Sequence, residues 1–174
     1  MKDQYNGVAR FLHWSIALLI IVNVLVALYM DELPKADKIS VESLHRSIGI
    51  LILEMVIFRI FWAFYKPAPP LPDSIPAKEK KLGKIVQHSL YLLMLLVPVF
   101  GYLLTITEGD PASFFNLYNL PAIMGENEAW QEFFEEGHEI LAWTLVALSS
   151  LHIAAGIKHL ISKDGIFERM WPKK

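Results

Sequence analysis

Four long stretches of the chain are almost entirely apolar, and the polar residues gather between them. The stretches run roughly over residues 9–30, 45–64, 85–107 and 138–161. Each has about the 20 residues that an α-helix needs to cross the hydrocarbon core of a bilayer. Because their apolar residues are continuous rather than alternating, a transmembrane β-barrel is excluded. The pattern predicts an all-α membrane protein, with residues 1–174 forming a single four-helix transmembrane bundle.

The segments around these stretches give further expectations. The first stretch ends at "LYMDE" and lacks a small-x-small cleavage site, so it is predicted to be a retained span rather than a signal peptide. "KPAPPLP" predicts an extended turn between the second and third spans. "EAWQEFFEE" has helical spacing of its aromatic residues and predicts either a helix along the membrane surface or a structureless loop. Pro98 is expected to kink the third helix.

Charge divides the connecting segments into two groups. Basic residues gather in the first ten residues, in the segment "YKPAPPLPDSIPAKEKKLGK" and in the C-terminal tail. The segment before the fourth span is acidic and holds Glu108, Asp110, Glu126, Glu128, Glu132, Glu135 and Glu136. Because basic residues stay on the cytoplasmic side, both termini are predicted to be cytoplasmic and the acidic segment periplasmic, in a bacterial inner membrane.

Composition narrows the class of protein. The chain has 174 residues, ordinarily one domain, and its apolar fraction of 54% is above the level usual for a soluble domain. A formal net charge of −2 gives no indication of nucleic-acid binding. The absence of cysteine excludes disulfides, thiolate-bound metals and iron–sulfur clusters.

The histidines are the candidate ligands for a metal or cofactor, a class of site that the composition does not exclude. All six lie in or at the edge of an apolar span: His13, His45, His88, His138, His152 and His159. Burying an imidazole in hydrocarbon is costly unless something pairs with it. His138 and His152 are fourteen residues apart, so they project from nearly one face of a helix, about 21 Å apart along its axis. One helix therefore offers two ligands, one towards each membrane surface.

Topology supplies a partner for each of these two histidines. His45 begins the second span and His138 the fourth, so both lie on the periplasmic side and can meet. His152 lies in the cytoplasmic half, where His13 is the natural partner and His88 a competitor. Small residues one turn further along each helix would let a flat macrocycle lie against it: Ala17, Gly49 and Gly156.

Two bis-histidine sites stacked across a bilayer suggest two haem b groups. Two imidazoles on one haem iron leave no open position, which favours electron transfer over oxygen chemistry. One alternative is a set of core histidines hydrogen-bonded between helices in a haem-free bundle. A zinc site is disfavoured because it needs three or four ligands at one depth.

The motifs that hold these histidines resemble the bacterial cytochrome b561 family of small four-helix, di-haem inner-membrane proteins. They are "RFLHW", "LHRSIGI", "GHEILAW" and "LHIAAGIKH", and the "KPAPP" turn and "VPVFGY" fit as well. The resemblance covers essentially the whole chain. It implies that His13 and His152 hold one haem and that His45 and His138 hold the other. The nearest type within the family is superoxide oxidase, which takes electrons from periplasmic superoxide and passes them to ubiquinone.

The remaining polar residues of the spans are second candidates. By the resemblance, His159 is assigned to a quinone site, with Ser15 and Lys158 as weaker candidates; the alternative for His159 is an interfacial histidine without a ligand. Arg59, Arg46 and Arg10 are candidates to bind haem propionates, since a buried arginine needs an anionic partner. Glu54 is expected to be protonated or hydrogen-bonded, and His88 to be an interfacial histidine.

Two functions compete once haem is accepted. The first is electron transfer from a periplasmic one-electron donor, superoxide by resemblance, through two haems to ubiquinone. The acidic loop strains that assignment, since Arg46 and nearby lysines would have to provide the local positive charge that attracts an anion. The second is a membrane-anchoring cytochrome b subunit, as in hydrogenases and formate dehydrogenases, that relays electrons between a soluble periplasmic enzyme and the quinone pool. The acidic loop would then dock a basic partner.

Overall fold

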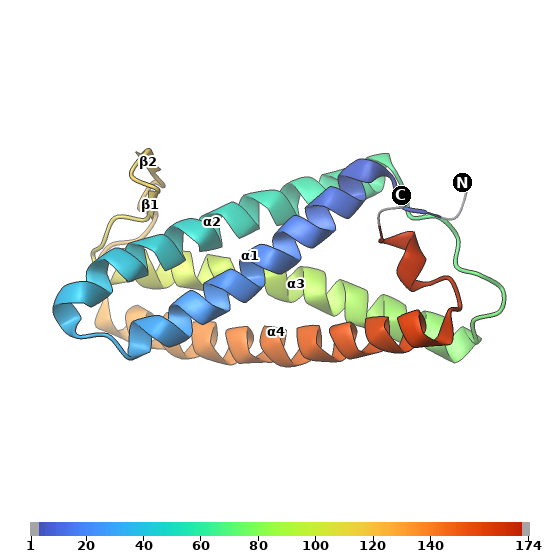
Figure 1. Cartoon of the computed structure of the whole chain (residues 1–174). Helices are drawn as coiled ribbons and strands as arrows, with labels where there is room; N and C mark the ends of the chain where they lie inside the picture. The colour runs from blue at the N-terminus through green and yellow to red at the C-terminus, as the bar shows by residue number, and fades with distance from the viewer. Residues whose placement is uncertain (1–3, 172–174) are drawn as a thin grey trace.

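The protein is an antiparallel four-helix bundle with a small hairpin at one end (Figure 1). The computed structural model describes residues 4–171, so residues 1–3 and 172–174 of the predicted domain lie outside the described part. Its helices are α1 (Gly7–Asp31), α2 (Lys35–Tyr65), α3 (Ala77–Thr107) and α4 (Glu128–Ser162). All four are long and apolar enough to cross a membrane, as the apolar stretches predicted.

Two shorter features complete the fold. Strands β1 (Ser113–Phe114) and β2 (Tyr118–Asn119) form an antiparallel hairpin, and a 3₁₀ helix, η1 (Phe167–Arg169), follows α4. The end of the bundle where α1 begins and α4 ends is called the terminal end below. The opposite end, from which the β-hairpin extends, is called the hairpin end (Figure 1).

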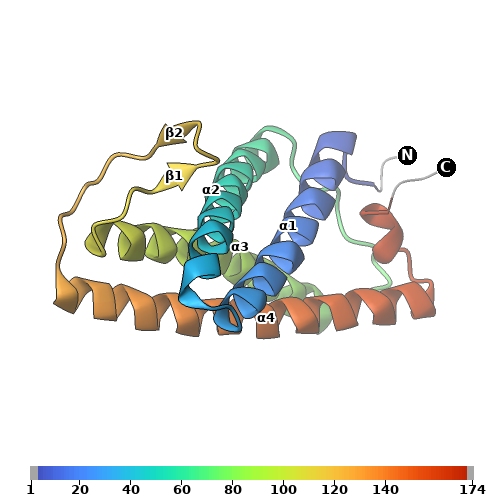
Figure 2. The same cartoon turned by 60° about the vertical axis from the view of Figure 1, so that its left-hand side comes forward.

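The helices pack as two pairs rather than as a closed square. Helix α1 packs on α2, α3 packs on α4, and α2 joins the pairs by packing on α3. Within residues 4–171, the backbone of α4 makes no close approach to that of α1 or α2. Figure 2 shows α1 and α2 standing together beside α3 and α4. Any contact from α1 or α2 to α4 must therefore be made by long side chains or by a bound group.

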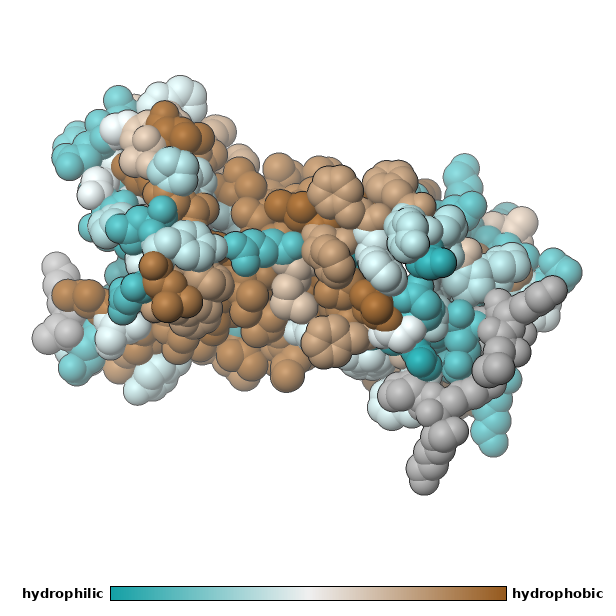
Figure 3. Space-filling view, turned by 90° about the horizontal axis from the view of Figure 1, so that it is seen from above, coloured by the Kyte–Doolittle hydropathy of each residue, from teal (hydrophilic) through white to brown (hydrophobic). Residues whose placement is uncertain are grey.

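The best-buried core lies between α1 and α2. It is built from residues at four-residue spacing on both helices: Leu12, Ile16, Ile48, Ile52 and Val56. That spacing places them on one face of each helix. Many other large apolar side chains of the helices are exposed, and Figure 3 shows a broad hydrophobic belt between two hydrophilic ends. A bilayer is the environment that such a surface needs.

Part of the acidic connection is helical. "EAWQEFFEE" is a helix, as its aromatic spacing predicted, and it is continuous with α4, of which it forms the first turns. The Asn127 side chain caps this helix by accepting a hydrogen bond from the Trp130 N–H, a cap that starts the helix well before its apolar stretch. Helix α3 runs through Pro98, and the expected kink there stays a prediction. "KPAPPLP" forms no helix, as predicted.

The β-hairpin is fastened to the outside of α2. The hydroxyl of Ser47, which is only 1% exposed, accepts a hydrogen bond from the Phe115 N–H and lies 3.2 Å from the Ser113 carbonyl oxygen. Further along α2, the Tyr118 hydroxyl donates to the Glu54 carboxyl group at 2.7 Å, and this hydrogen bond raises the pKa of Tyr118. Glu54 is therefore hydrogen-bonded, as expected for a carboxylate in an apolar span.

Candidate functional site

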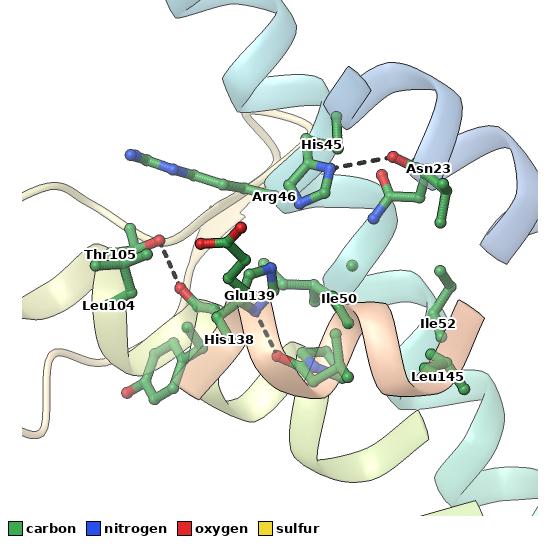
Figure 4. A pocket seen from close by; sticks show the side chains of 18 of the residues that line it. Asn23, His45, Arg46, Ile50, Ile52, Leu104, Thr105, His138, Glu139 and Leu145 are labelled. Atoms are coloured by element: carbon green, nitrogen blue, oxygen red, sulfur yellow. Dashed lines mark hydrogen bonds between the residues drawn. The ribbon is translucent and has the colours of Figure 1, made fainter. Parts of the chain in front are cut away.

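His45 of α2 and His138 of α4 meet at the hairpin end. Their ring centroids are 6.2 Å apart and the ring planes are nearly perpendicular, at 85°. The Nδ1 atom of His45 lies 3.3 Å from the Asn23 carbonyl oxygen, and that of His138 lies 2.9 Å from the Val97 carbonyl oxygen. Figure 4 shows both contacts. Because a carbonyl only accepts, each Nδ1 carries the proton and each Nε2 is left with a free lone pair, as in metal-binding histidines.

His13 of α1 and His152 of α4 form a second pair at the terminal end. Their ring centroids are 6.1 Å apart and their planes meet at 77°. Arg59 of α2 reaches this pair, with Nη2 3.1 Å from the His13 Nδ1 atom. Its Nε donates to the Tyr91 hydroxyl at 3.0 Å, and the guanidinium lies over the Tyr91 ring. The structure therefore brings Arg59 to the pair at the terminal end.

The spacing of each pair fits two imidazoles bound to one metal ion. A metal–imidazole bond of about 2 Å, with the ring centroid about 1.1 Å behind the nitrogen, puts two opposed centroids about 6.2 Å apart. An edge-to-face aromatic contact covers the same distance range, so distance alone does not separate the two interpretations. Within the described residues the backbone of α4 approaches neither α1 nor α2, so the histidine pairs bridge the space between these helices.

A cavity of about 410 Å³ opens beside His45 and His138. This volume is within the range of small-molecule and cofactor sites. Its lining is mostly apolar. Two of the lining residues are glycines, Gly49 of α2 and Gly101 of α3, so at these positions the wall is backbone alone. A Cβ on Gly101 would lie 3.0 Å from the His138 Cε1 atom. The buried Asn23 Oδ1 on this wall has no hydrogen-bond partner. A flat, largely apolar group with a metal at its centre fits these walls.

Other metal sites find little support in the structure. Within residues 4–171 there is no group of three or more histidine or carboxylate side chains placed to hold a metal ion. A protein zinc site needs three or four such ligands. His88 lies on an exposed part of α3 with its Nδ1 2.7 Å from the Lys84 carbonyl oxygen, away from the paired rings.

The rim of the cavity is dominated by carboxylates around one cation. Arg46 donates to Asp110 at 2.8 Å, to Glu42 at 2.8 Å and to Glu108 at 3.1 Å. Burial raises the pKa of Glu108, although Arg46 acts in the opposite direction. Arg46 is among the residues that line the cavity, and the charge of its guanidinium is already more than balanced by three acidic partners. Its role as a propionate ligand stays a prediction.

The other site residues named from the sequence are spread over the terminal end. Arg10 donates to the Trp171 carbonyl oxygen at 3.2 Å. Lys158 forms an exposed ion pair with Glu79 of α3 at 3.3 Å. Ser15 is half-buried on α1, two residues beyond His13. His159 contacts a residue that sequence reasoning did not single out, Asp164, at 2.6 Å.

Four residues around these sites were missed from the sequence: Asn23, Tyr91, Gly101 and Asp164. An asparagine within an apolar span is a signal that could have drawn attention to Asn23. Tyr91 and Gly101 belong to the sites because they contact residues of other helices, Arg59 and His138. A single sequence does not show such contacts. Asp164 could have been considered as the first carboxylate after the last histidine, at the start of the "DGIFER" segment.

Comparison with known proteins gives a consistent result over the full length of the chain. Residues 4–173 match the family model described as prokaryotic cytochrome b561. The chain is 32% identical to cytochrome b561 homolog 2 of Escherichia coli (strain K12), over 98% of this chain and 93% of that protein. It is 26% identical to the probable superoxide oxidase CybB of Yersinia pestis, over 100% of this chain and 99% of that protein. Cytochrome b561 homolog 1 of Escherichia coli (strain K12) is 23% identical over 99% of both chains.

Proposed function

The chain belongs to the prokaryotic cytochrome b561 family of multi-pass inner-membrane electron-transfer proteins, and on this premise we propose that it holds two haem b groups and uses them to move electrons from periplasmic superoxide to ubiquinone. Family membership supports haem b as the cofactor. The number of haems, the donor and the acceptor are the parts proposed here.

The observation that carries the proposal is the pair of histidine couples. Each couple spans the space between α4 and the α1–α2 pair at the centroid separation that one shared metal requires. His45 and His138 would hold one haem and His13 and His152 the other. Haem bound this way supplies one-electron redox chemistry, and its two imidazole ligands leave no open position on the iron.

The surrounding residues hold the ligands in place. Carbonyl oxygens of Asn23 and Val97 fix the ring orientation of His45 and His138, as outer-shell partners of metal ligands do. Arg59 is placed to accept a haem propionate, because its guanidinium is half-buried on α2 beside His13. An anion there would draw Arg59 away from the His13 Nδ1 atom. The ring would then be free to carry its proton on Nδ1, which leaves the Nε2 lone pair for a metal.

Charge supports an orientation for the electron flow. The terminal end carries the lysine-rich connection between α2 and α3, and the hairpin end carries the acidic connection between α3 and α4. By the positive-inside rule the terminal end is cytoplasmic and the hairpin end periplasmic. Electrons would enter beside His45 and His138 and leave beside His13 and His152, where His159, Ser15 and Lys158 are the candidates to bind ubiquinone.

The overall reaction balances as two superoxide anions plus one ubiquinone plus two protons giving two dioxygen molecules and one ubiquinol. Superoxide gives up one electron at a time and ubiquinone takes two, so two electron carriers in series suit the exchange. Support for superoxide as donor comes from the name of one relative, which is called a probable superoxide oxidase.

The test uses the purified full-length protein in nanodiscs. Haem content per chain is measured first, and absorption spectra are then followed as a superoxide-generating system and ubiquinone-1 are added in turn. We expect about two haems per chain, reduction by superoxide that superoxide dismutase prevents, and reoxidation by the quinone. A preparation without a Soret band after expression with ample haem would overturn the proposal.

One observation favours a second function, that of a membrane-anchoring cytochrome b subunit. Arg46 is surrounded by Glu42, Glu108 and Asp110, so the rim would repel a small anion and attract a basic protein. In that case the purified chain would not be reduced by superoxide. It would be reduced only when a second, basic redox protein is added.

A further inference from the structure

The segment after α4 turns back sharply on the helix that it leaves. Lys163 has a left-handed backbone with φ of 51°, and Gly165 has φ of 85°. Two positive φ values so close together reverse the chain within one turn. The reversal places the Asp164 carboxylate beside His159, five residues earlier on the last turn of α4.

Both oxygens of this carboxylate are engaged. Oδ2 lies 2.6 Å from the His159 Nδ1 atom, and Oδ1 accepts a hydrogen bond from the Ile166 N–H at 3.1 Å. The two side chains are largely buried, with 18% of His159 and 23% of Asp164 exposed. Burial opposes ionisation of Asp164, but the hydrogen bonds from His159 and Ile166 outweigh it and lower the pKa of Asp164. The carboxylate is therefore charged at neutral pH.

A charged carboxylate at this position determines which nitrogen of His159 can exchange a proton. A carboxylate only accepts, so the His159 Nδ1 atom carries a proton in both the neutral and the charged ring. The Nε2 atom then gains and loses the exchangeable proton. When Nε2 is also protonated, the Nε2–H is an acid on the side of the ring opposite the Nδ1–H that Asp164 holds.

The two residues lie at the terminal end, where ubiquinone is proposed to bind and would need a proton donor. His159 follows His152 by seven residues, which places it on the same face of α4 and about 10 Å nearer the terminal end. Lys158 is the other charged group that acts on Asp164, and its ammonium pairs with Glu79 of α3. A reduced quinone in this region requires protons from the protein, because it takes up two protons with its two electrons.

We propose that Asp164 and His159 form a proton-delivering dyad for ubiquinone, with Asp164 as the positioning residue that holds the Nδ1–H of His159 and thereby keeps the Nε2–H of the ring in place. The inference rests on the proposed function. In the step, the His159 Nε2–H bond breaks and an O–H bond forms on one carbonyl oxygen of the quinone as it is reduced. The second of the two protons comes from another donor. His159 is then reprotonated at Nε2 from water at the terminal end, while Asp164 retains the Nδ1–H.

The test compares Asp164→Asn with Asp73→Asn in the full-length, haem-loaded protein. Asp73 is a suitable control because it is fully exposed in the connection between α2 and α3, and within residues 4–171 it forms an ion pair only with Lys80, at 4.0 Å. Three quantities are measured: haem spectrum, ubiquinone-1 reduction rate against pH, and the titration of ¹⁵N-labelled histidines by NMR. His159→Gln identifies the His159 signal by its disappearance.

We expect Asp164→Asn to lower kcat for ubiquinone-1 by about tenfold or more, with KM changed much less. Its rate profile should change with pH in a way that Asp73→Asn does not reproduce, and the ¹⁵N shifts of His159 should show that Nδ1 no longer keeps its proton in the neutral ring. Haem spectrum and reduction by the donor should not change. The double variant with His159→Gln should be no slower than His159→Gln alone, since the two residues act as a unit.

Contrary outcomes separate the dyad from the function on which it rests. If Asp164→Asn matches Asp73→Asn in kcat, pH profile and histidine titration, the dyad is wrong even though the protein reduces quinone. If wild-type haem is reduced but never reoxidised by ubiquinone-1, the proposed function fails first. Loss of haem in Asp164→Asn would show a structural role for the residue and overturn the dyad as well.

Discussion

The imidazole of His138 lies against Gly101 so closely that a Cβ on Gly101 would be 3.0 Å from the ring Cε1 atom and 3.1 Å from Nδ1. This contact joins α3 to α4 at the wall of the cavity. The same ring is held by the Val97 carbonyl oxygen one turn earlier on α3. Helix α3 contributes no histidine to the pairs, yet it determines how His138 is presented to His45.

We therefore predict that Gly101→Val disrupts the proposed haem site at the hairpin end. The added branched side chain would displace the imidazole from its hydrogen bond with Val97 and weaken haem binding at that site by about 10- to 100-fold, as losses of second-shell support do. Gly101→Ala should have a smaller effect. The loss of haem is measured as haem content per chain and from the reduced-minus-oxidised spectrum.

Gly83→Ala is the matched control, since it lies on the same helix and a Cβ there meets nothing within 4 Å. It should retain both haems. Equal haem content in Gly101→Val and Gly83→Ala would show that His138 is not held at this wall in the way described.

Single ligand variants should separate the two sites. His45→Ala removes one ligand at the hairpin end and His152→Ala one at the terminal end, so each variant should lose one haem or bind it weakly and keep the other. His88→Ala should keep both, because His88 lies exposed on α3 and bonds only to its own helix. Pyridine haemochrome assays per chain give the count. Loss of both haems in one variant with retained helix content would contradict two independent sites.

The sequence predicted those parts of the fold that are determined by contact with the hydrocarbon core of the membrane. Spans are fixed by the cost of exposing polar groups to lipid, and the apolar stretches marked each of the four. The first turns of α2, α3 and α4 lie beyond those stretches and were missed. Helix α4 begins at the Asn127 cap, and α2 and α3 begin directly after Pro34 and Pro76. The β-hairpin depends on a distant hydroxyl, Ser47 on α2, and so has no local signal.

The site was predicted where helical spacing determines geometry. The pairing of His13 with His152 and of His45 with His138 followed from periodicity and chain direction, and the structure brings these rings together. Asp164 was missed because its position depends on the left-handed Lys163. The balance of charge around Arg46 was also missed, because two of its partners, Glu108 and Asp110, follow a different helix.

Arg59 should tune the proposed haem at the terminal end. Replacing it with glutamine removes a positive charge beside His13, which makes uptake of an electron less favourable. An effect on the order of 1 kcal/mol corresponds to about 40 mV for one electron, so the midpoint potential of one haem should fall by roughly that amount. Arg10→Gln is the control, since Arg10 bonds to the Trp171 carbonyl oxygen. A redox titration in which Arg10→Gln gives the larger shift would assign the propionate to Arg10.

The acidic rim gives a test that identifies the class of electron donor. Arg46 is balanced by three carboxylates, so a superoxide anion approaches against net repulsion. Salt screens such repulsion, and the rate of haem reduction by superoxide should therefore rise with ionic strength. Glu108→Gln should raise that rate and Arg46→Gln should lower it, each by up to about tenfold.

A basic donor protein predicts the opposite direction for each of these three effects, because salt and Glu108→Gln would both weaken its attraction to the rim. Stopped-flow measurement of haem reduction at low and high salt, in the wild type and both variants, decides between the two. Rates that depend on neither salt nor these residues would show that electrons enter away from this rim.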